Sequence, residues 1–289
     1  MEHPGRFSHF MFRVNSSSRV INKRFSGLLR GYFLSADHPM KLRLWHWMRL
    51  GLGYARLAVP YGTGTTITLD ERDHVQREIF IKGHYEPEVW ECINQFAVSK
   101  EEIFWDIGAH IGTFSIKAQV DERFKEAHAF EPDPITMSIL ALNSMLNRGC
   151  CHLHQIALSA RSEKKILMHG PEGNTGVSNL TLKVYSDKSF EVECISADDL
   201  IYKNKMNPPT ILKIDVEGWE LNVLKGASRL LSENSPKAII FEAECNDAGE
   251  LIEEEIVNLL RRFNYKIKRL LRHDGSLYSR ENYIAEQIS

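Results

Sequence analysis

The chain has 289 residues and a net charge of −2, and 43% of its residues are hydrophobic, enough for one large α/β domain or a domain with an extension. It contains no run of 18 apolar residues and no signal-peptide pattern, so neither a membrane span nor a secretion signal is expected. The five cysteines lack C-x-x-C pairing and the 12 histidines lack H-E-x-x-H spacing, so we expect a cytoplasmic protein without a metal site of its own.

Basic residues concentrate in the first 60 positions. This segment holds ten Lys or Arg and two acidic residues, a net charge of +8, so the other 229 residues sum to −10. We therefore predict a basic N-terminal arm at residues 1–60 and a separate domain at 61–289. Leu42, Trp45, Met48 and Leu52 recur at helical spacing and predict a helical extension. The arm either packs on the acidic domain or contacts an anionic lipid, polymer or partner; an organelle transit peptide is a further alternative.

The domain opens with short elements. Residues 65–69 and 79–81 read as strands, and residues 87–97 read as a helix with Pro87 in its first turn. An alternating strand and helix pattern begins after this helix.

Residues 104–116, FWDIGAHIGTFSI, lead from an apolar strand through a glycine turn into a helix. The aromatic and β-branched residues around Asp106 are typical of a central parallel strand that is covered on both faces. Gly108 and Gly112 bracket the turn, where a missing Cβ lets a ligand approach the main chain. The helix expected at 113–120 directs its free N–H groups at this turn. A plain strand–turn–helix connection is the alternative, and the next strand argues against it.

That next strand is the run AHAFEPDP at 127–134, which ends in Glu131, 23 residues beyond Gly108. An acidic residue at this spacing accepts hydrogen bonds from both ribose hydroxyls of a bound nucleoside; a solvated carboxylate is the alternative. Ala109 and His110 occupy the turn where a dinucleotide fingerprint needs its second glycine. The pattern therefore suits a nucleotide-like cofactor without a pyrophosphate.

The remaining elements continue the alternation of strands and helices. Strand patterns occur at 152–157, 211–216, 238–241, 265–271 and 283–287, and helix patterns occur at 135–147, 219–231 and 250–263. Between the third and fourth strands, a longer segment holds strand patterns at 164–168, 180–185 and 190–195 around the glycine-rich turn GPEGNTGVSN at 170–179. This turn is either a solvated connection or a substrate contact through His169, Asn174, Ser178 and Asn179. The alternation predicts a doubly wound, mainly parallel α/β sheet.

Carboxylates gather where the predicted parallel strands end, and this rim is where open α/β sheets bind ligands. The five residues are Asp106, Glu131, Asp215, Glu217 and Glu242. Lys213 lies inside the strand ILKID and is costly to bury alone. It either reaches the rim or pairs with one of these carboxylates.

Four segments of the chain resemble the FkbM-type methyltransferases. They are GHYEPEVWE at 83–91, WDIGAHIGTFS at 105–115, FEPDP at 130–134 and ILKIDVEGWELNVLKGA at 211–227. Members are class I enzymes that use S-adenosylmethionine (SAM), and the resemblance, which covers residues 64–287, implies a Rossmann-like, seven-stranded sheet with one antiparallel strand. It assigns cofactor binding to Glu86, Asp106, Gly108, His110, Gly112, Glu131 and Asp215. In the family, the turn between the two glycines often carries Asn where this chain has His110. This difference affects only the contact that the side chain at position 110 makes with the cofactor.

The resemblance implies O-methylation of a hydroxyl on a sugar, glycan or polyketide-like metabolite. A hydroxyl acceptor has a proton to lose, and Asp215, Glu217 and His110 are the candidate general bases, which the sequence does not rank. RNA methylation is an alternative, but the acidic body and the lack of an Asn/Asp-Pro-Pro-aromatic motif count against a nucleic acid partner. A non-catalytic SAM-binding or scaffold protein is the other alternative.

Overall fold

The computed structural model describes residues 57–62, 64–69, 73–149, 151–169, 179–181 and 190–288, together with residues 40, 43 and 47. Most of the basic arm, including Leu42, Trp45, Met48 and Leu52, lies outside the described residues, as does the predicted glycine-rich turn from 170 to 178. No helix within the described part is long and apolar enough to cross a membrane.

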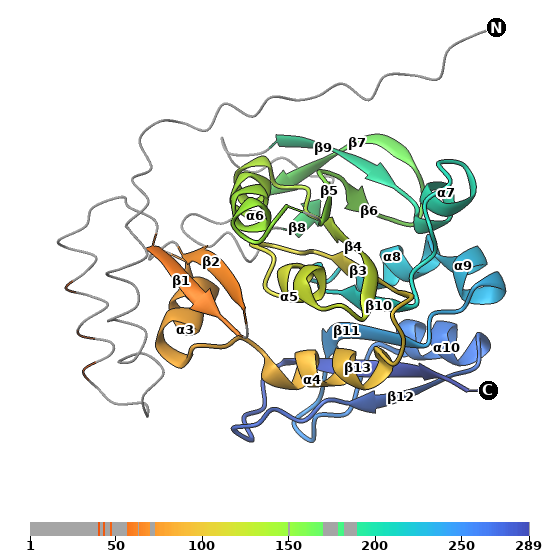
Figure 1. Cartoon of the computed structure of the whole chain (residues 1–289). Helices are drawn as coiled ribbons and strands as arrows, with labels where there is room; N and C mark the ends of the chain where they lie inside the picture. Colours follow the sequence, from red (N-terminus) through yellow and green to blue (C-terminus); the bar gives the residue numbers. More distant parts are fainter. Residues whose placement is uncertain are drawn as a thin grey trace, which may run out of the picture.

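A seven-stranded sheet forms the centre of the molecule (Figure 1). In spatial order its strands are β12 (Tyr265–Arg269), β13 (Arg280–Gln287), β11 (Ala238–Glu244), β10 (Ile211–Ile214), β3 (Glu102–Ile107), β4 (Phe124–Phe130) and β5 (His152–His154). The strands from β11 to β5 are parallel, whereas β13 is antiparallel to both of its neighbours. The predicted doubly wound, mainly parallel sheet with one antiparallel strand is confirmed.

Helices cover both faces of this sheet, because successive strand residues are apolar on both sides. Phe104 packs with α4, α5 and α6 on one face, and its neighbour Trp105 packs with α7, α8, α9 and α10 on the other. Ile211 and Leu212 on β10 divide between the two faces in the same way. The helices are α4 (Pro87–Phe96), α5 (Ser115–Val120), α6 (Pro134–Leu146), α7 (Ala197–Tyr202), α8 (Glu220–Lys225), α9 (Ser228–Glu233) and α10 (Glu254–Arg262).

The strand predicted at 79–81 is wrong, since these residues belong to the helix α3 (His74–Lys82). The Asp73 side chain caps this helix by accepting the Gln76 backbone N–H at 3.0 Å, and Gly83 ends it with a φ of 78°. Ile79 and Phe80 are buried on its inner face. The apolar run therefore fills one helical turn instead of a strand, and the capping aspartate is the local signal that decides between them.

A hairpin of β1 (Leu57–Tyr61) and β2 (Thr65–Leu69) packs with α3 beside the main sheet (Figure 1). Two asparagines hold β2 in place, one within α6 and one at its C-terminal cap. Asn143 Oδ1 accepts the Thr68 N–H at 2.7 Å, and Asn147 Oδ1 accepts the Thr66 N–H at 2.8 Å. β1 pairs with β2 across the predicted boundary near residue 60. The division into an arm and a domain at that residue stays a prediction.

A second sheet packs beside the first and explains two breaks in the predicted elements. Its order is β6 (Ala157–Leu158), β9 (Phe190–Ile195), β7 (Glu163–His169) and β8 (Asn179–Thr181). The strand predicted at 152–157 divides because β5 pairs with β4 while β6 pairs with β9. The helix predicted at 219–231 divides at Gly226, where an added Cβ would lie 2.0 Å from the Ser159 carbonyl oxygen.

Candidate functional site

A cavity opens at the carboxyl ends of β3, β4, β10 and β11. Its lining comprises the turn Gly108, Ala109 and His110, the carboxylates Glu131, Asp215, Glu217 and Glu242, the cation Lys213, and the apolar or aromatic residues Tyr85, Phe114, Phe130, Ile156 and Leu158, among others. Four of the five rim carboxylates that the sequence singles out therefore meet around one space. Asp106, Glu86 and Gly112 lie next to the cavity without lining it.

The two glycines of the turn are required by chain packing. Gly108 has a φ of 80°, and an added Cβ would lie 1.8 Å from the Asp215 carbonyl oxygen. Gly112 has a φ of 89°, and its Cβ would lie 2.5 Å from Leu140 Cδ1 of α6. The missing side chains thus let β3 and β10 approach each other where they leave the sheet, and they let α6 pack on the turn. Room for a ligand arises beside Gly108, not at Gly112.

Glu131 is held in a fixed orientation at the tip of β4. The His110 N–H donates to its Oε2 and the Asp133 N–H donates to its Oε1, both at 2.9 Å. Burial raises the pKa of Glu131 to about 7, although the nearby His110 opposes this rise. The carboxylate lines the cavity with lone pairs left over, as an acceptor for two adjacent hydroxyls requires.

His110 adopts a φ of 49°, which is uncommon for a residue with a side chain. Its ring Nε2 lies 3.7 Å from Asp73 Oδ2, the same aspartate that caps α3. Burial lowers the pKa of His110, but the hydrogen bond and charge of Asp73, with Glu131, outweigh burial and raise it. The ring therefore lies at the Glu131 end of the cavity and is tied to an acidic partner.

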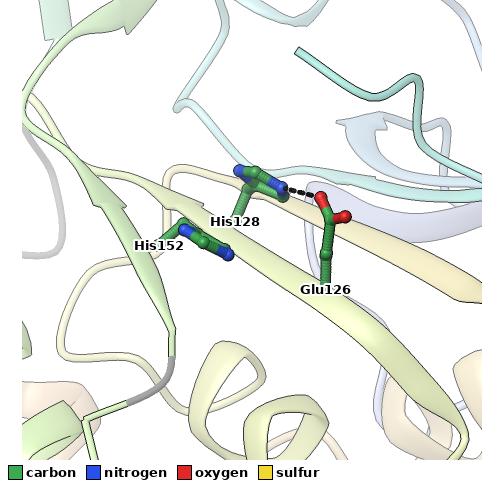
Figure 2. A group of neighbouring side chains, drawn as sticks. All are labelled: Glu126, His128 and His152. Carbon is green, nitrogen blue, oxygen red and sulfur yellow. Dashed lines mark hydrogen bonds and ion pairs between the residues drawn. The ribbon is translucent and has the colours of Figure 1, made fainter.

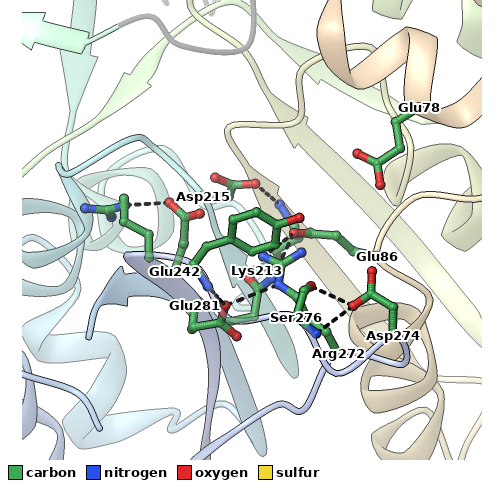
Figure 3. Close-up of polar contacts among 12 residues, drawn as sticks. Glu78, Glu86, Lys213, Asp215, Glu242, Arg272, Asp274, Ser276 and Glu281 are labelled. Carbon is green, nitrogen blue, oxygen red and sulfur yellow. Dashed lines mark hydrogen bonds and ion pairs between the residues drawn. The ribbon is translucent and has the colours of Figure 1, made fainter. Parts of the chain in front are cut away.

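Lys213 pairs with two aspartates, Asp215 and the buried Asp106, which answers the alternatives raised by the sequence. Figure 3 shows the first of these pairs, between Lys213 and Asp215. Its Nζ lies 3.0 Å from Asp215 Oδ2 and 3.8 Å from Asp106 Oδ1. Burial opposes its charge, but the two aspartates outweigh burial and raise the Lys213 pKa above its usual value. Asp106 of β3 is fully buried and accepts the Ser115 N–H of α5 at 3.0 Å. Its carboxylate therefore connects Lys213 of β10 with the start of α5.

Glu217 differs from Asp215 in its surroundings. It has a φ of 53°, and Gly218 follows at 93°. The buried Glu220 fixes this bend, because its Oε1 accepts the N–H groups of Val216 at 3.2 Å and Gly218 at 3.1 Å. Within the described chain no hydrogen bond or ion pair engages the Glu217 carboxylate, which lines the cavity. Burial, followed by the charges of Asp215 and Glu242, raises the pKa of Glu217 to about 8.

Two further glutamates complete the acidic side of the site. Glu242 of β11 accepts the Arg280 Nε at 2.6 Å, and burial with the charge of Asp215 raises its pKa to about 7. Glu86, which precedes α4 with a φ of 40°, accepts the Asn282 Nδ2 at 2.9 Å. Burial and Asp215 also raise the Glu86 pKa to about 7. Figure 3 shows Glu86, Lys213, Asp215 and Glu242 converging from separate segments.

The sequence did not single out the residues that hold these carboxylates. Arg280 pairs with Glu242 and lies 3.1 Å from Glu220 Oε2, and Arg272 lies 3.7 Å from Glu86 Oε1. These arginines belong to the C-terminal hairpin, which carries no motif. The register of β13 on β11 brings Arg280 to the rim by pairing Glu244 with Arg280 and Glu242 with Asn282. The contact between Arg280 and Glu242 could have been predicted only from the register between β11 and β13.

Comparison with known proteins identifies relatives of the whole domain. A family model, the methyltransferase FkbM domain, matches residues 106–267. The hexuronic acid methyltransferase AglP of Haloferax volcanii is 30% identical over 243 residues, which cover 78% of this chain and 95% of that protein. The 31-O-demethyl-FK506 methyltransferase FkbM of Streptomyces tacrolimicus is 24% identical over 240 residues, 73% of this chain and 88% of that protein.

Among solved structures, the precorrin-6y C5,15-methyltransferase of Geobacter metallireducens aligns with a TM-score of 0.40 at 14% identity, covering 70% of this chain and 88% of that one. The family assignment comes from the sequence matches instead. The family model covers more than half of the chain, and both sequence relatives are methyltransferases. The chain is therefore a member of the FkbM methyltransferase family.

Proposed function

We propose that this chain is a SAM-dependent O-methyltransferase that acts on a hydroxyl of a sugar, glycan or polyketide-like metabolite. Its relatives support this class of acceptor, since one is named for a hexuronic acid and the other for a 31-O-demethyl compound. The observation that carries the proposal is the cavity itself. It has a carboxylate held in position for a ribose, Glu131, at one end and, at the other, Glu217, whose carboxylate has no partner among the residues that the structure describes.

The lining suits SAM in its chemistry. Glu131 presents carboxylate oxygens beside the main chain of Gly108 and Ala109, and Phe130, Ile156 and Leu158 supply an apolar wall for a flat base. The carboxylates of Asp215 and Glu217 favour a positive group between them. A ribose, an aromatic base and a sulfonium thus each meet matching groups. Asp106, Glu86 and Gly112 would act on the cofactor through these neighbours, since they do not line the cavity.

Bound SAM supplies a methyl group that its positive sulfur has already activated. The protein must therefore place the acceptor oxygen and take up its proton. Placement in line with the transferred group contributes roughly 7 to 11 kcal/mol in well-oriented systems. The fixed bend at Val216 to Gly218, held by Glu220, is the element that sets this placement beside Asp215.

Glu217 is the base that the geometry supports best. Lys213 Nζ donates to Asp215 Oδ2 at 3.0 Å, so this oxygen is already engaged inside the protein. The His110 ring is tied to Asp73 and lies near Glu131, at the other end of the cavity. Glu217 lines the cavity, has no partner within the described chain and has a pKa of about 8, close to working pH.

The acidic rim also favours one acceptor chemistry. A hexuronic acid offers both hydroxyls and a carboxylate, but an acceptor carboxylate would meet Asp215, Glu217 and Glu242 at close range. The nearest arginine, Arg280, is already paired with Glu242 and Glu220. A hydroxyl, which donates a hydrogen bond to a carboxylate, is the better match. The same rim disfavours an RNA backbone.

The test is a transfer assay with isotope-labelled methyl. SAM affinity is first measured by calorimetry, and the protein is then incubated with labelled SAM and separate pools of neutral sugars, hexuronic acids, macrolide alcohols and RNA. We expect saturable SAM binding and label in a pool of hydroxylated small molecules, in an alkali-stable ether. Label released by mild alkali would indicate a carboxyl ester, label in RNA would support the nucleic acid alternative, and binding without transfer to any pool would support a non-catalytic role.

A further inference from the structure

Three potential metal ligands lie together outside the cavity, on the neighbouring strands β4 and β5. Glu126, His128 and His152 each present one carboxylate oxygen or ring nitrogen, and these atoms all lie within 4.8 Å of one another (Figure 2). Two imidazoles and a carboxylate form a donor set that binds zinc while leaving a position open for water.

Strand geometry brings these residues together. Glu126 and His128 are two residues apart on β4 and share one face of the sheet, and the parallel register places His152 of β5 opposite His128. The rings of His128 and His152 are stacked, with their centroids 4.6 Å apart and their planes 18° from parallel. Such a set has no short sequence spacing, which is why a search for ligand motifs in the sequence does not find it.

Outer contacts already orient two of the three side chains. His128 Nδ1 lies 3.0 Å from His154 Nε2, which leaves His128 Nε2 directed at Glu126 Oε2, 3.1 Å away. Asn207 Nδ2 donates to the other carboxylate oxygen, Glu126 Oε1, at 2.8 Å. Metal sites are built in this manner, with a second partner fixing the ring of each histidine ligand and the position of each carboxylate.

We propose that Glu126, His128 and His152 bind one first-row divalent cation, with zinc the ion that this donor set suits best. Ligand atoms about 2.1 Å from a tetrahedral ion are separated by about 3.4 Å, close to the distance between Glu126 Oε2 and His128 Nε2. The His152 ring reaches the same ion by turning about its soft Cβ–Cγ torsion. His152 is exposed and Glu126 is half-buried, so the ion enters directly from solvent.

The site is separate from methyl transfer. His128 lies three residues before Glu131 along β4, a separation of about 10 Å. The bound ion would tie the edge strand β5 to β4 and, through Asn207 and Glu126, to the segment after α7. We therefore assign the ion a stabilising role, because an edge strand paired on one side gains most from such a link.

Titration of tag-free protein with zinc chloride alone, in a competition assay with a chelating dye, tests the site. We expect one ion per chain with a dissociation constant in the micromolar range or below, and a rise in Tm on zinc addition. His152→Ala removes an exposed ligand and should weaken binding at least about tenfold and abolish the rise in Tm. His273→Ala is the matched control, since His273 is also exposed and lies 3.0 Å from a glutamate, Glu91, but belongs to no three-ligand group among the described residues.

Two results would overturn the assignment. One is the lack of saturable binding below about 100 μM zinc in the unaltered protein, which is weaker than a three-ligand site should be. The other is equal zinc affinity in the unaltered protein and in His152→Ala. Cobalt substitution adds a readout, because tetrahedral cobalt(II) absorbs strongly in the visible range. That band should appear in the His273→Ala variant and be lost in His152→Ala.

Discussion

Replacing Glu217 with Gln tests the proposed base most directly. The change keeps the size of the side chain and removes its charge, and with a pKa of about 8 the unaltered carboxyl is only about 1% ionised at pH 6 and about half ionised at pH 8. If Glu217 takes the proton, kcat/KM of the unaltered enzyme should rise about fiftyfold between these pH values. In Glu217→Gln the rate at pH 9 should fall by roughly 10²-fold or more, and the rise with pH should disappear.

A second substitution, at Glu242, distinguishes proton uptake by Glu217 from the effect of removing any one negative charge from the cavity. Glu242 is one of the carboxylates whose charge raises the Glu217 pKa. Glu242→Gln should therefore keep the pH-dependent rise but move its midpoint to lower pH. The assay is initial rate against pH with the acceptor found in the labelled-methyl screen, and SAM affinity and Tm of each variant serve as controls. An unchanged profile in Glu217→Gln would refute the reasoning and leave the proton to His110 or water.

Four other outcomes follow from the same geometry. Glu131→Gln should weaken SAM binding about tenfold to a hundredfold, measured by calorimetry, because a charge-assisted hydrogen bond is worth roughly 1.5 to 3 kcal/mol; unchanged affinity in a folded variant would remove the ribose assignment. Gly108→Ala should destabilise the fold by more than about 3 kcal/mol in denaturant unfolding, because its Cβ meets backbone, whereas Gly64→Ala, also at positive φ but with nothing within 4 Å, should cost only about 1 kcal/mol. Removing residues 1–30 should leave SAM affinity unchanged, since the first described residue that lines the cavity is Val75; lost binding in a well-folded truncation would make the arm part of the site. Finally, the ligand-free protein should lose stability as pH rises from about 5 to 8.5, because carboxyl groups with raised pKa values stabilise the protonated native state and lose this contribution as they ionise; a Tm that climbs over this range would contradict the raised values of Glu86, Glu131, Glu217 and Glu242.

The mainly parallel sheet could be predicted because its central strands are apolar on both faces and alternate with helices, whereas the antiparallel strand was expected only from the family resemblance. Residues 104–116 and 211–218 show both signals, and both lie where the sequence places them. Periodicity alone misread residues 79–81, since three apolar residues fit a strand or one turn of a helix equally well. Asp73, the cap that resolves this choice, lies six residues upstream of Ile79 and therefore outside the apolar run.

The carboxylates of the candidate site could be predicted from the sequence, but the side chains that pair with them could not. Glu131, Asp215 and Glu217 follow directly from strand ends. The partners of these carboxylates come from long-range pairing: Lys213 reaches Asp106 across β3 and β10, and Arg280 arrives through the antiparallel hairpin. Spacing along the chain carries no information about such contacts. This is also why the Glu126, His128 and His152 cluster depends on the three-dimensional register of β4 and β5.

The position of β13 in the sheet has a consequence for the order in which the site is assembled. This strand inserts between β11 and β12, and it delivers Arg280 to Glu242 and Asn282 to Glu86, a residue 196 positions earlier in the chain. Synthesis proceeds from the N-terminus, so the residues around Glu131 leave the ribosome before those that hold the acidic end of the cavity. Until residues 280–282 are synthesised, Glu242 lacks its arginine partner and Glu86 lacks the amide that donates to it. The last strand to be synthesised therefore fixes carboxylates whose own segments were made much earlier.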